Sequence, residues 1–225
     1  MPRQLVLDLP FRAAMGRADF FVCESNAAAV VGLDGWNGWP GGKMLLIGPA
    51  GSGKTHLAHV FAAQTGARIL SAADLPGMDV AALAEGEALV VEDADRIAGR
   101  PEAEEALFHL HNACADRRVA LLVTAATPPA RWGMTLPDLA SRMQQAGQLT
   151  LSPPDDALMA AVLVKLSADR QLALTPALVA HILPRIERSL DYVQRFVAAL
   201  DAEALAAKQK PGLRHVKTVI ARLAA

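Results

Sequence analysis

Residues 48–55 read Gly48-Pro49-Ala50-Gly51-Ser52-Gly53-Lys54-Thr55, and they match the pattern G-x-x-x-x-G-K-[ST] at every fixed position. Glycines in such a loop let successive backbone N–H groups point inward around phosphate oxygens, and the positive end of a following helix strengthens the binding. Lys54 would reach the β- and γ-phosphates of a nucleotide, and the hydroxyl of Thr55 would bind Mg²⁺. The stretch therefore predicts a nucleotide-binding loop. His56, the next residue, completes the candidate cofactor-binding residues of this segment.

Short apolar runs alternate with helical patterns around this loop. The apolar runs predict strands at 44–47, 67–70, 88–91 and 119–123. Helices are expected at 54–66 and 102–117, and the second carries Glu102, Glu104 and Glu105 in its first turn, where the helix dipole favours acidic side chains. Residues 19–42, rich in glycine, predict turns and loops. Strands that alternate with helices predict an α/β fold with a parallel sheet.

The pattern changes at residues 152–156, after which only helical patterns follow. Helices are expected at 155–170, 189–209 and 214–224, and Thr175 before Pro176 is typical of a helix start. We therefore predict three parts. These are a short N-terminal peptide at 1–18, an α/β nucleotide-binding domain at 19–152 and a small all-helical domain at 153–225.

Composition limits the class of protein. The chain has 225 residues, of which 52% are hydrophobic, so it can bury a substantial core. Its formal net charge of -1 is unlike the basic excess of a free-standing DNA-binding module. The sequence shows neither a signal peptide nor an apolar run long enough to span a membrane. These observations predict a cytoplasmic protein without a membrane partner.

Acidic residues follow the apolar run at 88–91. Glu92 and Asp93 stand where a carboxylate could hold the water shell of Mg²⁺ and a second could orient an attacking water. We expect Glu92 to serve the metal and Asp93 to serve catalysis. The alternative is that these acids cap the next helix. A phosphate loop followed by acids and a helical second domain suits an AAA+ ATPase, which consists of a core and a lid.

Four segments resemble the DnaA family of AAA+ proteins, and more closely its shortened, Hda-type members. They are Asp19-Phe-Phe-Val-Cys-Glu-Ser-Asn26, Gly53-Lys-Thr-His-Leu-Ala-His59, Thr135-Leu-Pro-Asp-Leu-Ala-Ser-Arg-Met143 and Ile186-Glu-Arg-Ser-Leu190. The resemblance implies a P-loop AAA+ core with a parallel five-stranded sheet and a small helical lid. It also implies that Val22 and Asn26 lie beside the adenine of bound ADP or ATP.

The resemblance assigns roles to two arginines. Arg142 matches the arginine finger, which neutralises charge on the transferred phosphoryl group of a nucleotide held by an adjacent subunit. Arg188 matches the lid arginine that contacts the phosphates of the bound nucleotide. The alternatives are surface ion pairs, of Arg142 with Asp138 and of Arg188 with Asp191 or Glu187.

The N-terminal peptide contains Gln4-Leu5-Val6-Leu7-Asp8-Leu9. This segment resembles the peptide with which Hda-type proteins dock on the sliding clamp, the β subunit of DNA polymerase III. The amide of Gln4 would form hydrogen bonds, and Leu5, Leu7 and Leu9 would enter an apolar cleft. An edge strand or an unstructured tail is the alternative.

The resemblance implies a regulator of DNA replication initiation. Together with the DNA-loaded clamp, it would stimulate hydrolysis of the ATP bound to DnaA and prevent re-initiation. The sequence ends at Ala225, directly after the lid, so we expect no direct specific binding of DNA. The resemblance also allows a homo-oligomer.

One departure from the family concerns the protein's own nucleotide. Ala126 stands where the family has a polar sensor residue, and Glu92 stands where an Asp is usual. Both changes predict weak or absent intrinsic ATPase activity. Rival interpretations are a clamp-loader or helicase-loader subunit and a P-loop small-molecule kinase.

Overall fold

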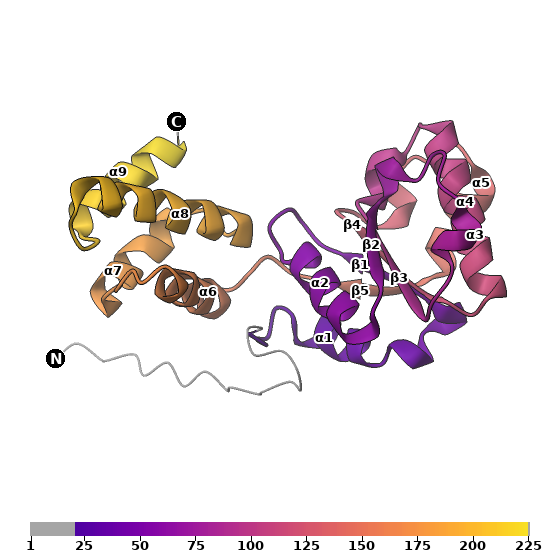
Figure 1. Cartoon of the computed structure of the whole chain (residues 1–225), viewed down its shortest axis with the longest axis horizontal. Coiled ribbons are helices and arrows are strands. Elements are labelled where there is room, and N and C mark those ends of the chain that lie inside the picture. The colour runs from indigo at the N-terminus through magenta and orange to yellow at the C-terminus, as the bar shows by residue number, and fades with distance from the viewer. Residues whose placement is uncertain (1–20, 225) are drawn as a thin grey trace. The chain divides into compact units, whose positions relative to one another are not determined.

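The computed structural model describes residues 21–224, which divide into two compact units (Figure 1). One unit is Ser25–Pro153, with mixed α/β structure, and the other includes residues 154–224, which are helical. The peptide expected to bind the clamp, with Gln4, Leu5, Leu7 and Leu9, lies outside the described residues. Its role stays a prediction.

A five-stranded parallel sheet forms the centre of the α/β unit, which confirms the predicted fold class. The strand order is β2-β3-β4-β1-β5. In this order β1, which precedes the phosphate loop, lies between β4 and β5. The strands are β1 (Lys43–Ile47), β2 (Arg68–Ser71), β3 (Ala88–Glu92), β4 (Ala120–Ala125) and β5 (Gly147–Thr150).

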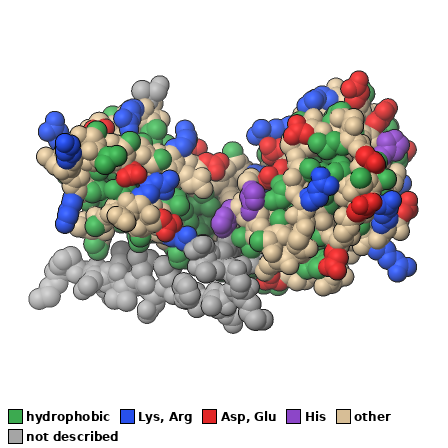
Figure 2. Space-filling model, viewed as in Figure 1, with side chains coloured by type: hydrophobic (Ala, Val, Ile, Leu, Met, Phe, Trp, Pro, Cys, Tyr) green, Lys and Arg blue, Asp and Glu red, His purple; other side chains and the backbone are tan. Residues whose placement is uncertain are grey.

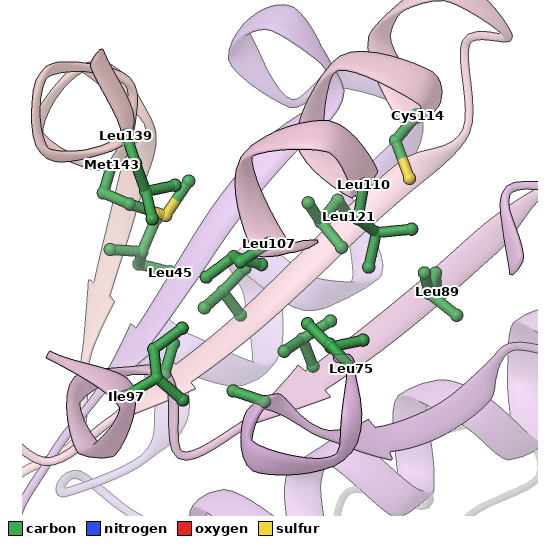
Figure 3. Packing of buried hydrophobic residues seen from close by; sticks show 14 of the residues in the cluster. Leu45, Leu75, Leu89, Ile97, Leu107, Leu110, Cys114, Leu121, Leu139 and Met143 are labelled. Carbon is green, nitrogen blue, oxygen red and sulfur yellow. The ribbon is translucent and has the colours of Figure 1, made fainter. Parts of the chain in front are cut away.

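Helices cover both faces of the sheet (Figure 1). On one side lie α1 (Ala27–Asp34) and α2 (Lys54–Thr65), and on the other lie α3 (Val80–Leu83), α4 (Pro101–Asp116) and α5 (Pro137–Gln145). Because side chains alternate along a strand, β1 sends Leu45 and Ile47 into the core beneath α4 and α5. Leu107, Leu139 and other labelled residues pack in this core in Figure 3.

Helix α1 corrects the expectation of turns and loops at 19–42. Its buried residues are Ala29, Val30 and Leu33, which a 3.6-residue period places on one side of the helix. Gly32 lets the helix lie directly against β5, since a Cβ at this position would collide with the side chain of Leu149. This contact with a strand far along the sequence stabilises a helix whose local signals are weak.

The helical unit contains α6 (Asp156–Asp169), α7 (Pro176–Ile182), α8 (Leu190–Ala207) and α9 (Leu213–Ala224). Side chains cap three of these helices. Asp155 accepts a hydrogen bond from the N–H of Leu158 at 2.7 Å, and Thr175 accepts one from Leu178 at 3.3 Å. Ser189 caps α8 in the same way. Phe196, fully buried, lies at the centre of the core that α6, α8 and α9 share.

The surface of the α/β unit carries charges of both signs. Figure 2 shows Lys and Arg side chains intermingled with Asp and Glu over its visible face. Within the range 21–224, none of the helices combines the length and apolar character needed to cross a lipid bilayer.

Candidate functional site

The phosphate loop joins β1 to α2, and its backbone conformation depends on glycine. Gly51 has a φ of 69° and Gly53 a φ of 99°, in the region that side chains disfavour. A Cβ on Gly48 would lie 2.7 Å from Ser52 Oγ and 2.9 Å from the carbonyl oxygen of Leu151. The loop therefore folds as tightly as the motif predicts, with the chain after β5 packed against its first glycine.

Polar groups of the loop suit a phosphate ligand. The ammonium of Lys54 donates to the carbonyl oxygens of Gly48 at 2.7 Å and Pro49 at 3.0 Å, which places this cation over the loop. Ser52 is buried, and its Oγ has no hydrogen-bond partner within the described residues. Thr55 and His56, in the first turn of α2, are exposed to solvent. These donors fit the phosphate groups of a nucleotide.

The acids at the end of β3 are separated from the strand that carries this loop, β1, by one strand, β4. Glu92 ends β3, and Asp93 follows it with a φ of 57°, unusual for a residue other than glycine. The N–H of Asp93 donates to the hydroxyl of Thr124, which is buried in β4, at 3.1 Å. Because β4 lies between β3 and β1, Thr124 fixes the acids near the β1 end that carries the loop.

A Mg²⁺ ion would bind here through few protein groups. Within the described residues, no group of three or more His, Cys, Asp and Glu side chains surrounds a common point. Mg²⁺ usually keeps several waters and binds one or two carboxylates together with phosphate oxygens. Thr55 and Glu92 have the right chemistry for such a site, and their role as metal ligands stays a prediction.

Asp95 is a residue that sequence analysis missed. Its Oδ2 accepts a hydrogen bond from the backbone N–H of Ala126 at 3.0 Å, and its Oδ1 is buried without a partner in the described part of the chain. Ala126 occupies the position where the resemblance expects a polar side chain. The carboxylate of Asp95 instead connects the ends of β3 and β4.

Arg142 lies towards the opposite end of the sheet from the phosphate loop. It belongs to the last turn of α5, shortly before β5 begins at Gly147, and Gly147 pairs with Met44 at the start of β1. The phosphate loop leaves β1 at its other end, after Ile47. Strands rise about 3.3 Å per residue, so the length of β1 alone separates the two ends by roughly 13 Å.

The guanidinium of Arg142 is exposed and contacts an aromatic ring. Its Cζ lies 5.2 Å from the ring centroid of Phe108 on α4, the range of a cation–π interaction. The structure thus gives Arg142 an aromatic partner in place of the alternative ion pair with Asp138. Leu139 and Met143, on the other side of α5, are buried in the core (Figure 3).

Glu104 lies in the first turn of α4, as expected, and its side chain is fully buried. Its carboxylate accepts hydrogen bonds from the N–H groups of Gly99 and Leu136, both at 2.7 Å, and from the N–H and hydroxyl of Thr135. Burial alone would raise the pKa of Glu104, but the hydrogen bonds from Leu136, Thr135 and Gly99 hold it below its ordinary value.

A second buried polar group of α4 is influenced by the charge of Arg142. His111, on α4, is 7% exposed. Burial, together with the positive charges of Lys43 and Arg142, lowers its pKa from 6.5 to about 4. Lys43 begins β1 and is itself buried, with its ammonium donating to the carbonyl oxygen of Gly41 at 3.2 Å. The influence of both cations on one imidazole agrees with the location of Arg142 near the start of β1.

Three residues that are predicted to contact the nucleotide lie outside the phosphate loop. Arg188 belongs to the helical unit, where it forms an ion pair with Asp156 at 2.7 Å rather than with Asp191 or Glu187. Both side chains of this pair are mostly exposed. Asn26 is buried at the start of α1, and Val22 precedes the α/β unit. The contacts of Arg188, Asn26 and Val22 with a nucleotide stay predictions.

The fold is that of AAA+ proteins, as comparison with solved structures shows. The chain is similar to the AAA domain of FIGL-1 in complex with ADP, with 14% identity and a TM-score of 0.68 over 91% of this chain and 83% of that one. No protein-family model matches the sequence.

Within this class the chain is similar to the replication initiator DnaA. Domain III of DnaA from Thermotoga maritima is 17% identical, with a TM-score of 0.74 over 89% of this chain and 92% of that domain. DnaA from Aquifex aeolicus bound to AMPPCP is 16% identical, with a TM-score of 0.68 over 83% of this chain and 65% of that one. At these identities the likeness establishes a DnaA-like AAA+ fold.

Proposed function

We propose that this protein binds ADP or ATP, with Mg²⁺, in the loop at 48–55. The support is the tight loop geometry, the cation of Lys54 over it and the unpartnered hydroxyl of Ser52. Similar folds bind nucleotides, since the FIGL-1 and A. aeolicus DnaA structures hold ADP and AMPPCP. Ala126 offers no polar side chain to water or phosphate, so the protein's own hydrolysis is weak or absent.

The proposed activity acts on the nucleotide of a partner. Arg142 approaches the γ-phosphate of ATP bound to DnaA and neutralises the charge that develops there, which accelerates hydrolysis and inactivates the initiator. An arginine finger supplied in trans is worth a factor of about 10³–10⁵ in rate. The observation that carries this proposal is the location of Arg142, exposed on α5 and towards the far end of β1 from its own phosphate loop.

The sliding clamp completes the proposal. The peptide at Gln4–Leu9 tethers the protein to the clamp on DNA, where the initiator is then inactivated during replication. Support for this step comes from the sequence resemblance, and a pull-down on immobilised clamp tests it. Substituting Gln4 and Leu5 together by Ala should abolish retention on the clamp. Retention equal to that of the parent protein would contradict the tether.

The central experiment measures hydrolysis of DnaA-bound ATP with clamp loaded on DNA. The Arg142→Ala variant should not stimulate hydrolysis. The Arg142→Lys variant should retain only a small part of the parent protein's stimulation, because an ammonium lacks the planar donor geometry of guanidinium. Arg131→Ala, at another exposed arginine of the same unit, is the matched control and should stimulate fully. Full stimulation by Arg142→Ala would refute the finger role.

A further inference from the structure

Helix α4 presents two side chains to the segment that carries Arg142. Glu104 and Phe108 are four residues apart, so they lie one turn from each other on the same side of the helix. Glu104 contacts the residues that precede α5, and Phe108 contacts Arg142 near the end of α5. The two contacts therefore hold this segment at both of its ends.

The contact at Glu104 determines where α5 begins. Its carboxylate binds the N–H groups of Thr135, at 2.9 Å and 3.2 Å, and of Leu136, at 2.7 Å, and α5 starts at the next residue, Pro137. Hydrogen bonds to an ionised acceptor are about twice as strong as neutral ones, and burial excludes competing water. A loop anchored in this way restricts the rotation and translation of the helix that follows.

The contact at Phe108 uses only one part of the Arg142 side chain. The Cζ of Arg142 lies over the ring of Phe108, 5.2 Å from its centroid, while the residue itself is exposed. A guanidinium has five N–H donors, so those that do not face the ring stay available for phosphate oxygens. The ring contact also reduces the number of rotamers that an exposed arginine would otherwise sample, and this lowers the entropic cost of engaging a phosphate.

We propose that Glu104 and Phe108 are positioning residues, which pre-organise Arg142 for the phosphate of a nucleotide held by a partner subunit. Glu104 fixes the start of α5, and Phe108 holds the guanidinium over its ring. This inference rests on the proposed finger role of Arg142. It adds that the finger works as a rigid group supported by α4 rather than as a mobile surface side chain.

The first test compares maximal stimulation with apparent affinity. Glu104→Gln and Phe108→Leu should lower the maximal rate of partner ATP hydrolysis by roughly tenfold to a hundredfold, the usual effect of a small misplacement. The protein concentration for half-maximal stimulation should stay within about twofold, since positioning affects the reaction rather than docking. Phe108→Tyr retains an aromatic ring and should restore most of the rate.

Controls separate positioning from a general structural effect. Glu105→Gln removes a carboxylate from the same helix at an exposed position and should stimulate like the parent protein. An increase in the protein concentration for half-maximal stimulation, with the maximal rate unchanged, in Glu104→Gln and Phe108→Leu would overturn the proposal, because it would show an effect on docking instead of on the reaction.

A second readout does not depend on the partner. The Phe108 ring should shift the side-chain proton resonances of Arg142 upfield in NMR spectra of the protein alone. Phe108→Leu should abolish this shift and Glu104→Gln should reduce it. Full stimulation by both variants, with Arg142→Ala inactive, would overturn positioning but leave the finger role intact. If Arg142→Ala stimulates fully, the finger role fails, and unchanged Arg142 resonances in both variants would then overturn positioning as well.

Discussion

The Nζ atom of Lys54 lies 2.7 Å from the carbonyl oxygen of Gly48, the first residue of its own loop. A second carbonyl, from Pro49, lies 3.0 Å away. Two backbone carbonyls of the loop thus accept hydrogen bonds from this ammonium. Phosphate oxygens are charged acceptors and form stronger hydrogen bonds than neutral carbonyls, so a nucleotide phosphate in the loop would be a stronger partner for Lys54.

Replacing Lys54 by Ala should weaken ADP binding by roughly tenfold to a hundredfold, the usual value of a hydrogen bond to a charged group. Isothermal titration calorimetry measures this change directly. Lys165→Ala, at a lysine of the helical unit that pairs with Asp169, is the control and should bind like the parent protein. Equal affinity in the Lys54 variant would show that the ammonium does not contact the nucleotide.

A methyl group at Gly48 should damage the loop. The added Cβ would lie too close to Ser52 Oγ and the Leu151 carbonyl, so the backbone must shift. Gly48→Ala should lower the free energy of unfolding by about 1–3 kcal/mol and weaken nucleotide binding. Gly38→Ala is the matched control, because a Cβ there has nothing within 4 Å. Denaturant unfolding with and without ADP measures both effects, and a Gly48 variant as stable as the control would contradict the geometry.

The hydroxyl of Thr124 should matter through the backbone it holds. Thr124→Val keeps the shape of the side chain but leaves the N–H of Asp93 without its acceptor. The free energy of unfolding should fall by about 1–3 kcal/mol. Thr150→Val, at an exposed position in β5, serves as the control. Equal stability of the two valine variants would show that Asp93 finds another acceptor at no cost.

His111 should make stability depend on pH. Its pKa is about 4 in the folded protein and 6.5 ordinarily, so the unfolded chain binds the proton more readily. Stability should therefore fall as the pH is lowered from 6.5 towards 4, by up to about 3 kcal/mol. His111→Gln should remove this part of the pH dependence, whereas His109→Gln, at an exposed histidine, should not.

The same imidazole reports on the charges nearby. Arg142→Ala and Lys43→Met should each raise the pKa of His111, because each removes a positive charge that opposes protonation. An NMR titration of the His111 ring measures both shifts. A pKa unchanged by Arg142→Ala would place the guanidinium farther from His111 than the structure does.

Local signals predicted the parts of the fold that depend on nearby residues. The loop motif places a strand before Gly48 and a helix from Lys54, and the structure has both, with Gly66 ending α2 at a φ of 70°. Asp155 and Thr175 cap helices as their neighbours in sequence suggest. Each of these features depends on residues within a few positions of one another.

Other features depend on contacts between distant segments, and the sequence could not reveal them. Glu104 has the sequence context of an ordinary first-turn acid, but its partners Thr135 and Leu136 lie about thirty residues later, directly before α5. The distance of Arg142 from the phosphate loop follows from the pairing of Gly147 with Met44, which no local pattern encodes. The buried Glu104 carboxylate, between charged neighbours Glu102 and Glu105, therefore gave no recognisable signal.

The strand order has a consequence for synthesis of the chain on the ribosome. Strand β1 is translated before β2 and β3, but its neighbours in the sheet are β4 and β5, which emerge much later. Until then the apolar segment at 43–47 has no strand partner, and its pairing must close a long loop. A chaperone that shields this segment while the unit is being synthesised should therefore raise the yield of folded protein.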